Sequence, residues 1–224
     1  SGKISTRISA IDVDMSDPQR PVLFWTDHHS GRIAFTTIPP PSDAKLYEYP
    51  YQSSASRTER RRRRDHGDPE RDGQPQTLID GLNDPRGIAV DWVNRLIYWT
   101  EAGSKTIRAV SLIGNHLKRT IVEGNLERPE EVVVDPEQGR LYWIDHSAQP
   151  KIEGARLDGE KRSFLASKDL LRPTGLAIDR PNGRLYWADP KAHLIESLAL
   201  DGTGRKVVKS FPRGGDQPFG INIF

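Results

Sequence analysis

The sequence contains no cysteine and a single methionine among its 224 residues. A disulfide framework is therefore excluded, and on its own this absence is typical of a reducing compartment. The 33 basic and 31 acidic residues nearly cancel, so the net charge of +2 does not indicate a protein that binds nucleic acid or a charged membrane surface. No apolar stretch of about 18 residues occurs, so we expect any membrane anchor to lie outside this chain.

No segment has a sustained helical period, but one unit returns every 44 residues. The unit reads PRGIAVDWVNRLIYWTE from Pro85, PEEVVVDPEQGRLYWID from Pro129 and PTGLAIDRPNGRLYWAD from Pro173. A fixed period of this length is typical of an array in which each unit buries its faces by stacking on its neighbours. We therefore expect the function to lie on the rims of the array.

The sequence of each unit predicts four short β-strands. The runs are rich in Val, Ile, Tyr and Trp, and Gly, Pro, Asn and Asp separate them at intervals of about ten residues. Continuous apolar strands such as IAV and LYW indicate burial on both faces, as in sheets that stack radially into propeller blades. The pattern therefore predicts an all-β propeller.

Three positions of the unit are expected to be structural. A tryptophan packs between blades, an aspartate ends the first strand, and an acidic residue at the end of the aromatic strand accepts hydrogen bonds. The tryptophans are Trp25, Trp99, Trp143 and Trp187, the first-strand aspartates are Asp91, Asp135 and Asp179, and the acidic ends are Asp27, Glu101, Asp145 and Asp189.

The residues before Pro85 fit the same template but carry an insertion. Trp25 takes the Trp99 position and precedes it by 74 residues, which is longer than the period. At the other end, QPFGINIF predicts the first strand of a further unit. Four units and a fragment do not close a ring, so we expect a piece of a longer protein.

The runs FWTD, YWTE, YWID and YWAD, with GIAVD-like strands before them and LDG turns after them, resemble the YWTD (class B) repeats of the low-density lipoprotein receptor family. The resemblance covers nearly the whole chain outside the insertion. It implies a six-bladed YWTD β-propeller that is incomplete here, with about blades two to five plus the first strand of blade six. Propellers of this family hold together without disulfides, which reconciles the lack of cysteine with an extracellular protein.

The resemblance also implies a function. We expect a non-catalytic extracellular module of an endocytic single-pass receptor, found at the plasma membrane and in endosomes, that binds and releases protein or lipoprotein ligands. Its neighbours would be EGF-like and ligand-binding repeats. No cofactor, metal ion or nucleic-acid partner is expected.

The insertion within blade two, residues 39–76, is rich in proline and serine and contains five consecutive arginines, Arg60 to Arg64. Such a composition buries too little apolar surface to fold, so we predict a disordered, exposed loop. A furin-class convertase cuts a large endocytic member of the family in a similar loop, and extended arginines suit its acidic groove. The alternatives are a plain solvated charge run and a nucleic-acid patch. The predicted cleavage site comprises Arg61, Arg62, Arg63, Arg64 and Asp65.

The loops that follow each YWTD-like run and those that enter each first strand should share one rim. By resemblance this rim binds the family's partners, although a solvated rim without a ligand is the simpler alternative. Two histidines on it are also candidates for acid-dependent release. The predicted ligand face comprises His28, Arg86, Glu130, His146 and Lys191.

Two other classes share the predicted fold. A calcium-dependent propeller lactonase needs about six to eight oxygen ligands in its central channel. The corresponding positions here hold Arg86, Glu130, Thr174 and Phe219, which cannot build that site, so we predict a protein that is not an enzyme. A propeller of a secreted matrix protein or of a Wnt co-receptor has the same repeats and differs chiefly in lacking the insertion.

Overall fold

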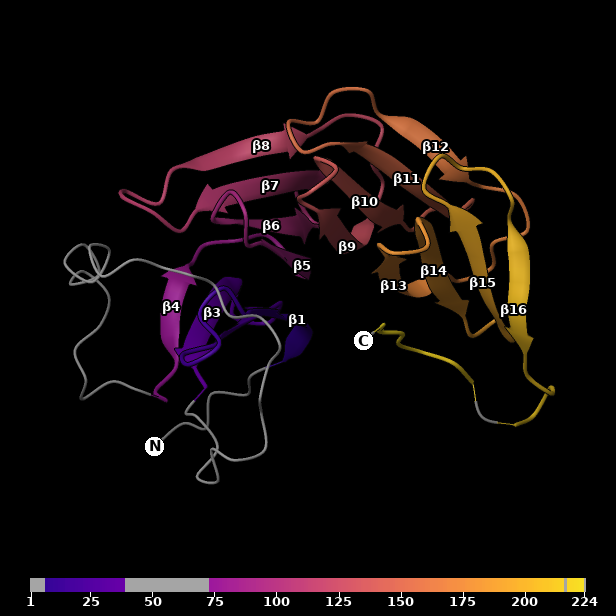
Figure 1. Cartoon of the computed structure of the whole chain (residues 1–224), viewed down its shortest axis with the longest axis horizontal. Coiled ribbons are helices and arrows are strands. Elements are labelled where there is room, and N and C mark those ends of the chain that lie inside the picture. Colours follow the sequence, from indigo (N-terminus) through magenta and orange to yellow (C-terminus); the bar gives the residue numbers. More distant parts are fainter. Residues whose placement is uncertain (1–6, 39–72, 216, 224) are drawn as a thin grey trace.

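A computed structural model describes residues 7–38, 73–215 and 217–223. These residues form 16 strands in four antiparallel sheets of four, and they contain no helix that could cross a membrane. Figure 1 shows the sheets side by side along an arc, each with its first strand innermost and its fourth strand outermost. The predicted all-β, incomplete propeller is confirmed.

Each sheet is one blade, and we name the blades A to D in chain order. Blade A contains β1 (Ile8–Asp14), β2 (Val22–Asp27), β3 (Arg32–Thr37) and β4 (Gln76–Ile79). Blade B contains β5 (Pro85–Asp91), β6 (Leu96–Glu101), β7 (Thr106–Ser111) and β8 (Lys118–Val122). Blade C contains β9 (Pro129–Asp135), β10 (Arg140–Asp145), β11 (Lys151–Arg156) and β12 (Ser163–Ala166). Blade D contains β13 (Thr174–Asp179), β14 (Arg184–Asp189), β15 (Leu194–Ala199) and β16 (Lys206–Ser210).

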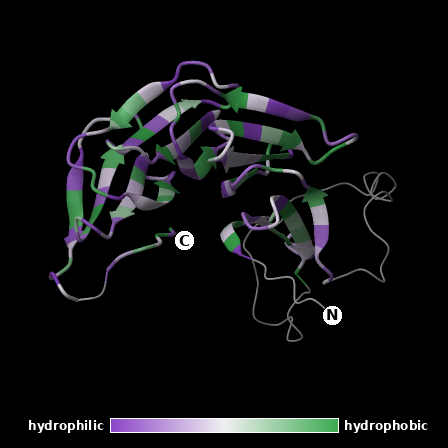
Figure 2. Cartoon of the chain, turned by 180° about the vertical axis from the view of Figure 1, so that it is seen from behind, coloured by the Kyte–Doolittle hydropathy of each residue, from purple (hydrophilic) through white to green (hydrophobic). Residues whose placement is uncertain are grey.

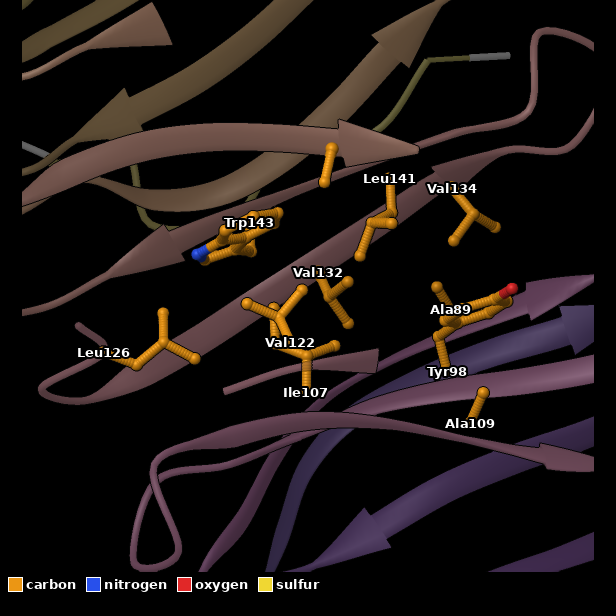
Figure 3. Close-up of a cluster of buried hydrophobic side chains, with 11 residues drawn as sticks. Ala89, Tyr98, Ile107, Ala109, Val122, Leu126, Val132, Val134, Leu141 and Trp143 are labelled. Atoms are coloured by element: carbon orange, nitrogen blue, oxygen red, sulfur yellow. The ribbon is translucent and has the colours of Figure 1, made fainter. Parts of the chain in front are cut away.

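The core lies between blades. Adjacent residues of a strand face opposite sides of its sheet, so Tyr98 packs toward blade C while Trp99 packs toward blade A. Figure 3 shows the layer between blades B and C, to which Tyr98 of β6 and both Leu141 and Trp143 of β10 contribute. Hydrophobic residues recur along the strands of every blade in Figure 2. A single blade would leave these faces in water, so the blades fold as a stack.

A hydroxyl of the aromatic strand links neighbouring blades. Thr26 Oγ1 donates to the carbonyl oxygen of Arg86 at 2.6 Å, which joins blade A to blade B. Thr100 Oγ1 donates to the carbonyl oxygen of Glu130 at 2.5 Å, which joins blade B to blade C. The same Thr100 hydroxyl accepts the N–H of Gly87 at 2.8 Å, so it serves its own blade and the next.

The inner strands also approach each other closely. A Cβ atom added to Gly87 of β5 would lie 2.3 Å from the Glu130 carbonyl oxygen of β9, so only glycine fits there. Gly175 of β13 has the same tight surroundings, with the Ile221 nitrogen 2.8 Å from an added Cβ. Gly220 and Ile221 therefore lie beside β13, where a further inner strand would pack.

The predicted first strand of a further blade is nevertheless absent, because residues 217–223 form no strand. A strand needs a neighbour that receives its backbone hydrogen bonds. The described part of the chain contains no second strand for that blade, so the segment packs against β13 without joining a ladder.

The insertion begins and ends at one edge of blade A. β3 and β4 pair antiparallel, with Ile33 opposite Ile79, and the Gly73 N–H donates to Thr37 Oγ1 at 3.1 Å. Gln76, assigned to the insertion by its sequence, is the first residue of β4. Residues 39–72, and with them the predicted cleavage site at Arg61 to Asp65, lie outside the described residues.

The carboxyl of one inner-strand residue, Glu131, has no partner among the described residues. Glu131 of β9 takes the position that Gly87 holds in β5, and it forms no hydrogen bond or ion pair with any other residue that the structure describes. Burial raises the pKa of Glu131 to about 7, and the negative charges of Glu130 and Asp12 add to the effect. The charged form of Glu131 is therefore unfavourable in the folded state.

The folded pKa of Glu131 lies above its ordinary value of 4.5, so between these two pKa values the folded chain binds a proton that the unfolded chain releases. The carboxylate thus destabilises the fold above about pH 7, and this penalty disappears as the pH falls toward about 4.5. We expect Glu131→Gln to raise the free energy of unfolding at alkaline pH by about 1–2 kcal/mol, with the partial exposure of the carboxyl discounted. Denaturant unfolding across this pH range measures the effect.

Glu137→Gln is the matched control, because Glu137 is exposed in the turn after the same strand and is not one of the charges that raise the Glu131 pKa. This variant should keep the wild-type pH dependence. A loss of stability in Glu131→Gln at alkaline pH would contradict the assignment of Glu131 as an unpartnered, destabilising carboxylate.

Candidate functional site

Two sets of loops meet on one rim of the propeller, which we call the upper rim. It comprises the connections after the second strands (28–31, 102–105, 146–150 and 190–193) and the segments that enter the first strands (80–84, 123–128 and 167–173). The strand pairing places them together, since Pro85 lies opposite Glu101 and Pro129 lies opposite Asp145. The lower rim carries the turns between first and second strands.

All five residues of the predicted ligand face lie on the upper rim. His28, His146 and Lys191 belong to the turns that follow β2, β10 and β14, and Arg86 and Glu130 are the second residues of β5 and β9. Lys191 is exposed, and Arg86 and Glu130 are half-buried. The rim therefore presents both positive and negative groups.

Two candidates are already engaged in ion pairs. Arg86 Nε lies 2.8 Å from Asp84 Oδ1, and Arg128 Nε lies 2.9 Å from Glu130 Oε1. Both pairs bracket a proline, in the runs Asp84-Pro85-Arg86 and Arg128-Pro129-Glu130. Sequence reasoning missed Asp84 and Arg128, although opposite charges two residues apart were a visible signal.

The third blade junction breaks this pattern. Arg172 precedes Pro173 as Arg128 precedes Pro129, but Thr174 follows in place of an acid. Within the described part of the chain, the exposed Arg172 guanidinium has no acidic partner. Arg172 is thus a further cation of the upper rim that the sequence patterns did not single out.

The acidic ends of the aromatic strands hold the upper rim in place, as predicted. Asp145 accepts hydrogen bonds from the backbone N–H groups of Glu127 and Arg128, at 3.1 and 2.7 Å. Asp189 binds the two residues before Pro173 in the same way, and Glu101 accepts the Asn83 N–H at 3.1 Å. Each carboxylate therefore ties the segment that enters its own blade to the end of the second strand.

Both candidate histidines make hydrogen bonds. His28 Nδ1 lies 2.7 Å from Ser9 Oγ, and His146 Nε2 lies 2.6 Å from the carbonyl oxygen of Pro173. A carbonyl oxygen only accepts, so His146 Nε2 carries the hydrogen. In blade C, Ile144 replaces the linking threonine, and His146 supplies the bond to the next blade instead.

The first-strand aspartates lie on the lower rim. Asp91 Oδ1 accepts the Val93 and Asn94 N–H groups at 3.1 and 2.8 Å, which closes the turn after β5. Asp135 and Asp179 close the matching turns after β9 and β13.

A groove of about 420 Å³ opens on the lower rim between blades C and D. Its lining includes Asp135, Arg140, Tyr142 and Arg180, and none of the predicted ligand-face residues. Arg180 reaches from this groove across blade C to the Trp92 ring, 4.6 Å from the ring centre. The groove and the predicted ligand face therefore occupy opposite rims.

Comparison with known families identifies the repeat. Residues 95–136 and 139–180 match the model of the low-density lipoprotein receptor repeat class B. Low-density lipoprotein receptor-related protein 8 of chicken (Gallus gallus) is 49% identical over 45 residues, which is 20% of this chain and 5% of that protein. A human low-density lipoprotein receptor-related protein 5-like protein is 38% identical over 58 residues, which is 25% of this chain and 23% of that protein. The matched segments thus cover only small parts of this chain and of both relatives.

Solved structures extend the similarity to the whole fold. A chain of the nidogen/laminin complex superposes with a TM-score of 0.74 at 28% identity, over 98% of this chain and 69% of that chain. A gluconolactonase from Xanthomonas campestris has a TM-score of 0.67 at 19% identity, over 98% of this chain and 67% of that chain, and shares the fold alone. Residues 95–136 and 139–180 therefore match low-density lipoprotein receptor class B repeats, and the described chain has the fold of an incomplete YWTD propeller.

Proposed function

We propose that this chain is the extracellular propeller module of an endocytic lipoprotein-receptor-related receptor and that its upper rim binds protein or lipoprotein ligands. The observation that carries the proposal is the gathering of charged and imidazole side chains on one rim whose backbone is held by Glu101, Asp145 and Asp189. A binding surface built on such a fixed frame loses little conformational entropy when a partner docks.

In the ion pairs of the upper rim, a charged group of a ligand can take the place of one partner. In the Asp84–Arg86 and Arg128–Glu130 pairs, side-chain exposure ranges from 25% to 52%, so both are open to solvent. Exposed pairs contribute only about 0–1 kcal/mol, so a ligand charge can replace one member at little cost. Arg172, which has no acidic partner among the described residues, offers a further contact for an acidic group.

The similar propeller in the nidogen/laminin complex supports protein binding by this kind of module. It also favours a second candidate, a propeller of a secreted matrix protein, because the 28% identity to that chain extends over 98% of this one. The arginine-rich insertion favours the receptor. With its flanking sequence it resembles the last propeller of low-density lipoprotein receptor-related protein 1. In that arrangement EGF-like repeats, ligand-binding repeats and a membrane anchor lie elsewhere in the protein.

Processing by a furin-class convertase is the second part of the proposal. The five-arginine run lies between β3 and β4, and these strands pair with each other and with the rest of blade A. In addition, the Leu82 N–H donates to the Gly31 carbonyl oxygen at 2.8 Å, which joins the chain after β4 to the chain before β3. A cut after Arg64 would therefore leave two chains held together without a covalent bond.

The first test is expression of the chain in secretory cells with active convertases. We expect two fragments on a denaturing gel and one species on a native gel, because the β3–β4 ladder and blade B hold both fragments. Changing Arg60 and Arg64 together to Ala should abolish cleavage, because no two arginines between residues 57 and 64 are then three residues apart, whereas Arg62→Ala, which keeps Arg61 and Arg64, should not. A single uncut band from the wild-type chain would contradict the proposal.

The second test reverses the charges of the upper rim, with Arg86→Glu and Glu130→Lys together. Plasma lipoprotein particles and a laminin fragment serve as probes, and surface plasmon resonance measures their binding. We expect at least a roughly tenfold weaker affinity for a probe that docks on this rim, since like charges across an interface cost about 1.4 kcal/mol or more.

Arg156 and Asp158 provide the matched control, because they form an ion pair at 3.5 Å on the lower rim with 49% exposure on each side. Reversing both should leave the binding of either probe unchanged. Equal effects of the two double variants, or no effect of the upper-rim variant on a probe that binds, would remove the upper rim as the ligand face.

A further inference from the structure

In one of the four blades, the indole N–H of the repeated tryptophan donates a hydrogen bond to a carboxylate. In blade B, Trp99 Nε1 donates to Glu101 Oε1 at 3.0 Å, and both side chains are buried. Arg108 binds the same Oε1 atom at 3.2 Å and lies over the Trp99 ring. The blade with a glutamate at the end of its aromatic strand thus satisfies its indole directly.

The other three blades end this strand with aspartate, and their indoles are left without a protein acceptor. The Nε1 atoms of Trp25, Trp143 and Trp187 are buried and have no hydrogen-bond partner among the described residues. Aspartate is shorter than glutamate by one carbon–carbon bond, about 1.5 Å. Its carboxylate is also drawn to the upper rim, where Asp145 and Asp189 receive backbone N–H groups.

Blade A shows the matching acceptor. Asp27 Oδ1 accepts three backbone N–H groups, whereas the buried Asp27 Oδ2 has no hydrogen-bond partner among the described residues, although Arg32 lies 3.5 Å from it. A buried donor at Trp25 and a buried acceptor at Asp27 are therefore both unsatisfied, two residues apart on β2. Buried polar groups in folded proteins are rarely left unpaired unless water reaches them.

We propose that a buried water molecule binds beside Trp25, Trp143 and Trp187, in the place that Glu101 Oε1 occupies beside Trp99. The water accepts the indole N–H and donates to the carboxylates that surround it. In blade A the acceptor is Asp27 Oδ2. In blades C and D it is the glutamate opposite the tryptophan, because backbone N–H groups and, in blade C, Lys151 already occupy the strand-end aspartates.

Blades C and D offer the polar surroundings that such a water needs. Glu153 lies opposite Trp143 and Glu196 lies opposite Trp187 in the strand pairing, and both carboxylates are buried. Arg162 binds Glu153 and Arg205 binds Glu196, each through two hydrogen bonds, which leaves one acceptor site on each carboxylate oxygen. Buried waters typically make about two to four hydrogen bonds to such groups.

Nuclear magnetic resonance of the full chain, labelled with nitrogen-15 at its tryptophans, tests the proposal. Cross-relaxation between each indole hydrogen and bound water should appear for Trp25, Trp143 and Trp187 and be absent for Trp99. The Trp187 signal also serves as a control, because an ammonium group that exchanges hydrogens with water can produce a similar cross-peak at a nearby indole. Lys151 lies opposite Asp145 in blade C, whereas Leu194 takes that position opposite Asp189 in blade D.

Two reciprocal variants should create the water site in one blade and remove it in another. Glu101→Asp should create a water cross-peak at Trp99, and Asp145→Glu should remove the one at Trp143 while Trp187 stays unchanged. Each variant keeps the negative charge, and the wild-type spectrum alone already decides the main point if one variant fails to fold. Indoles of Trp143 and Trp187 without bound water, or a Trp99 indole that gains none in Glu101→Asp, would overturn the proposal.

Discussion

Tyr98 and Trp99 are neighbours in one strand, yet they pack against different blades. This two-sided burial is the constraint on which the rest of the structure depends, because no blade can cover its own faces. The clusters on either side of blade B consist of buried aliphatic and aromatic side chains, and Figure 3 shows the one toward blade C. Removing a buried tryptophan from such a layer typically costs about 3–5 kcal/mol, so the blades stabilise one another strongly.

Close stacking of the blades also determines which polar groups can form hydrogen bonds between blades. The inner strands approach until glycine alone fits at Gly87, and the backbone carbonyl groups of the next blade then come within reach of the Thr26 and Thr100 hydroxyls. The segments that enter blades B and C lie beside the ends of the second strands, because the strand-end carboxylates Glu101 and Asp145 accept their backbone N–H groups. The upper rim is thus a rigid surface whose charged side chains are free to vary between blades.

The junctions between blades differ in their hydrogen bonds and in how closely they pack. Between blades B and C, Thr100 bonds to the Glu130 carbonyl, and the Tyr98 hydroxyl donates to the Leu157 carbonyl at 3.2 Å. Between blades C and D, His146 replaces the threonine bond, the unpartnered Glu131 lies on the inner strand, and the lower-rim groove opens. Blade D is therefore joined to the stack by a more polar and more open junction than blade C.

The sequence predicted the parts of the fold that repeat. A period of 44 residues with aligned Trp99, Trp143 and Trp187 was enough to place four strands per blade, because the same side chains must fill the same layer each time. It also placed the candidate residues on one rim, since that follows from strand direction alone.

Departures from the repeat could not be predicted, because they depend on neighbours that lie in other units. The substitution of His146 for a threonine bond is visible only when Pro173 is seen beside it. The isolation of Glu131 depends on the groups that surround it in three dimensions. Residues 217–223 have strand-like residues but no partner strand, so local preference was overridden by the lack of a ladder.

The most direct test of the account is the stability of Thr100→Val, which removes the hydroxyl between blades B and C and leaves the Glu130 carbonyl oxygen without that bond. Thr106→Val is the control, because the buried Thr106 hydroxyl of the same blade has no hydrogen-bond partner among the described residues. Denaturant unfolding should show a loss of about 1–3 kcal/mol for Thr100→Val and little change for Thr106→Val. Equal stabilities of the two variants would contradict the claim that contacts between blades hold this fold together.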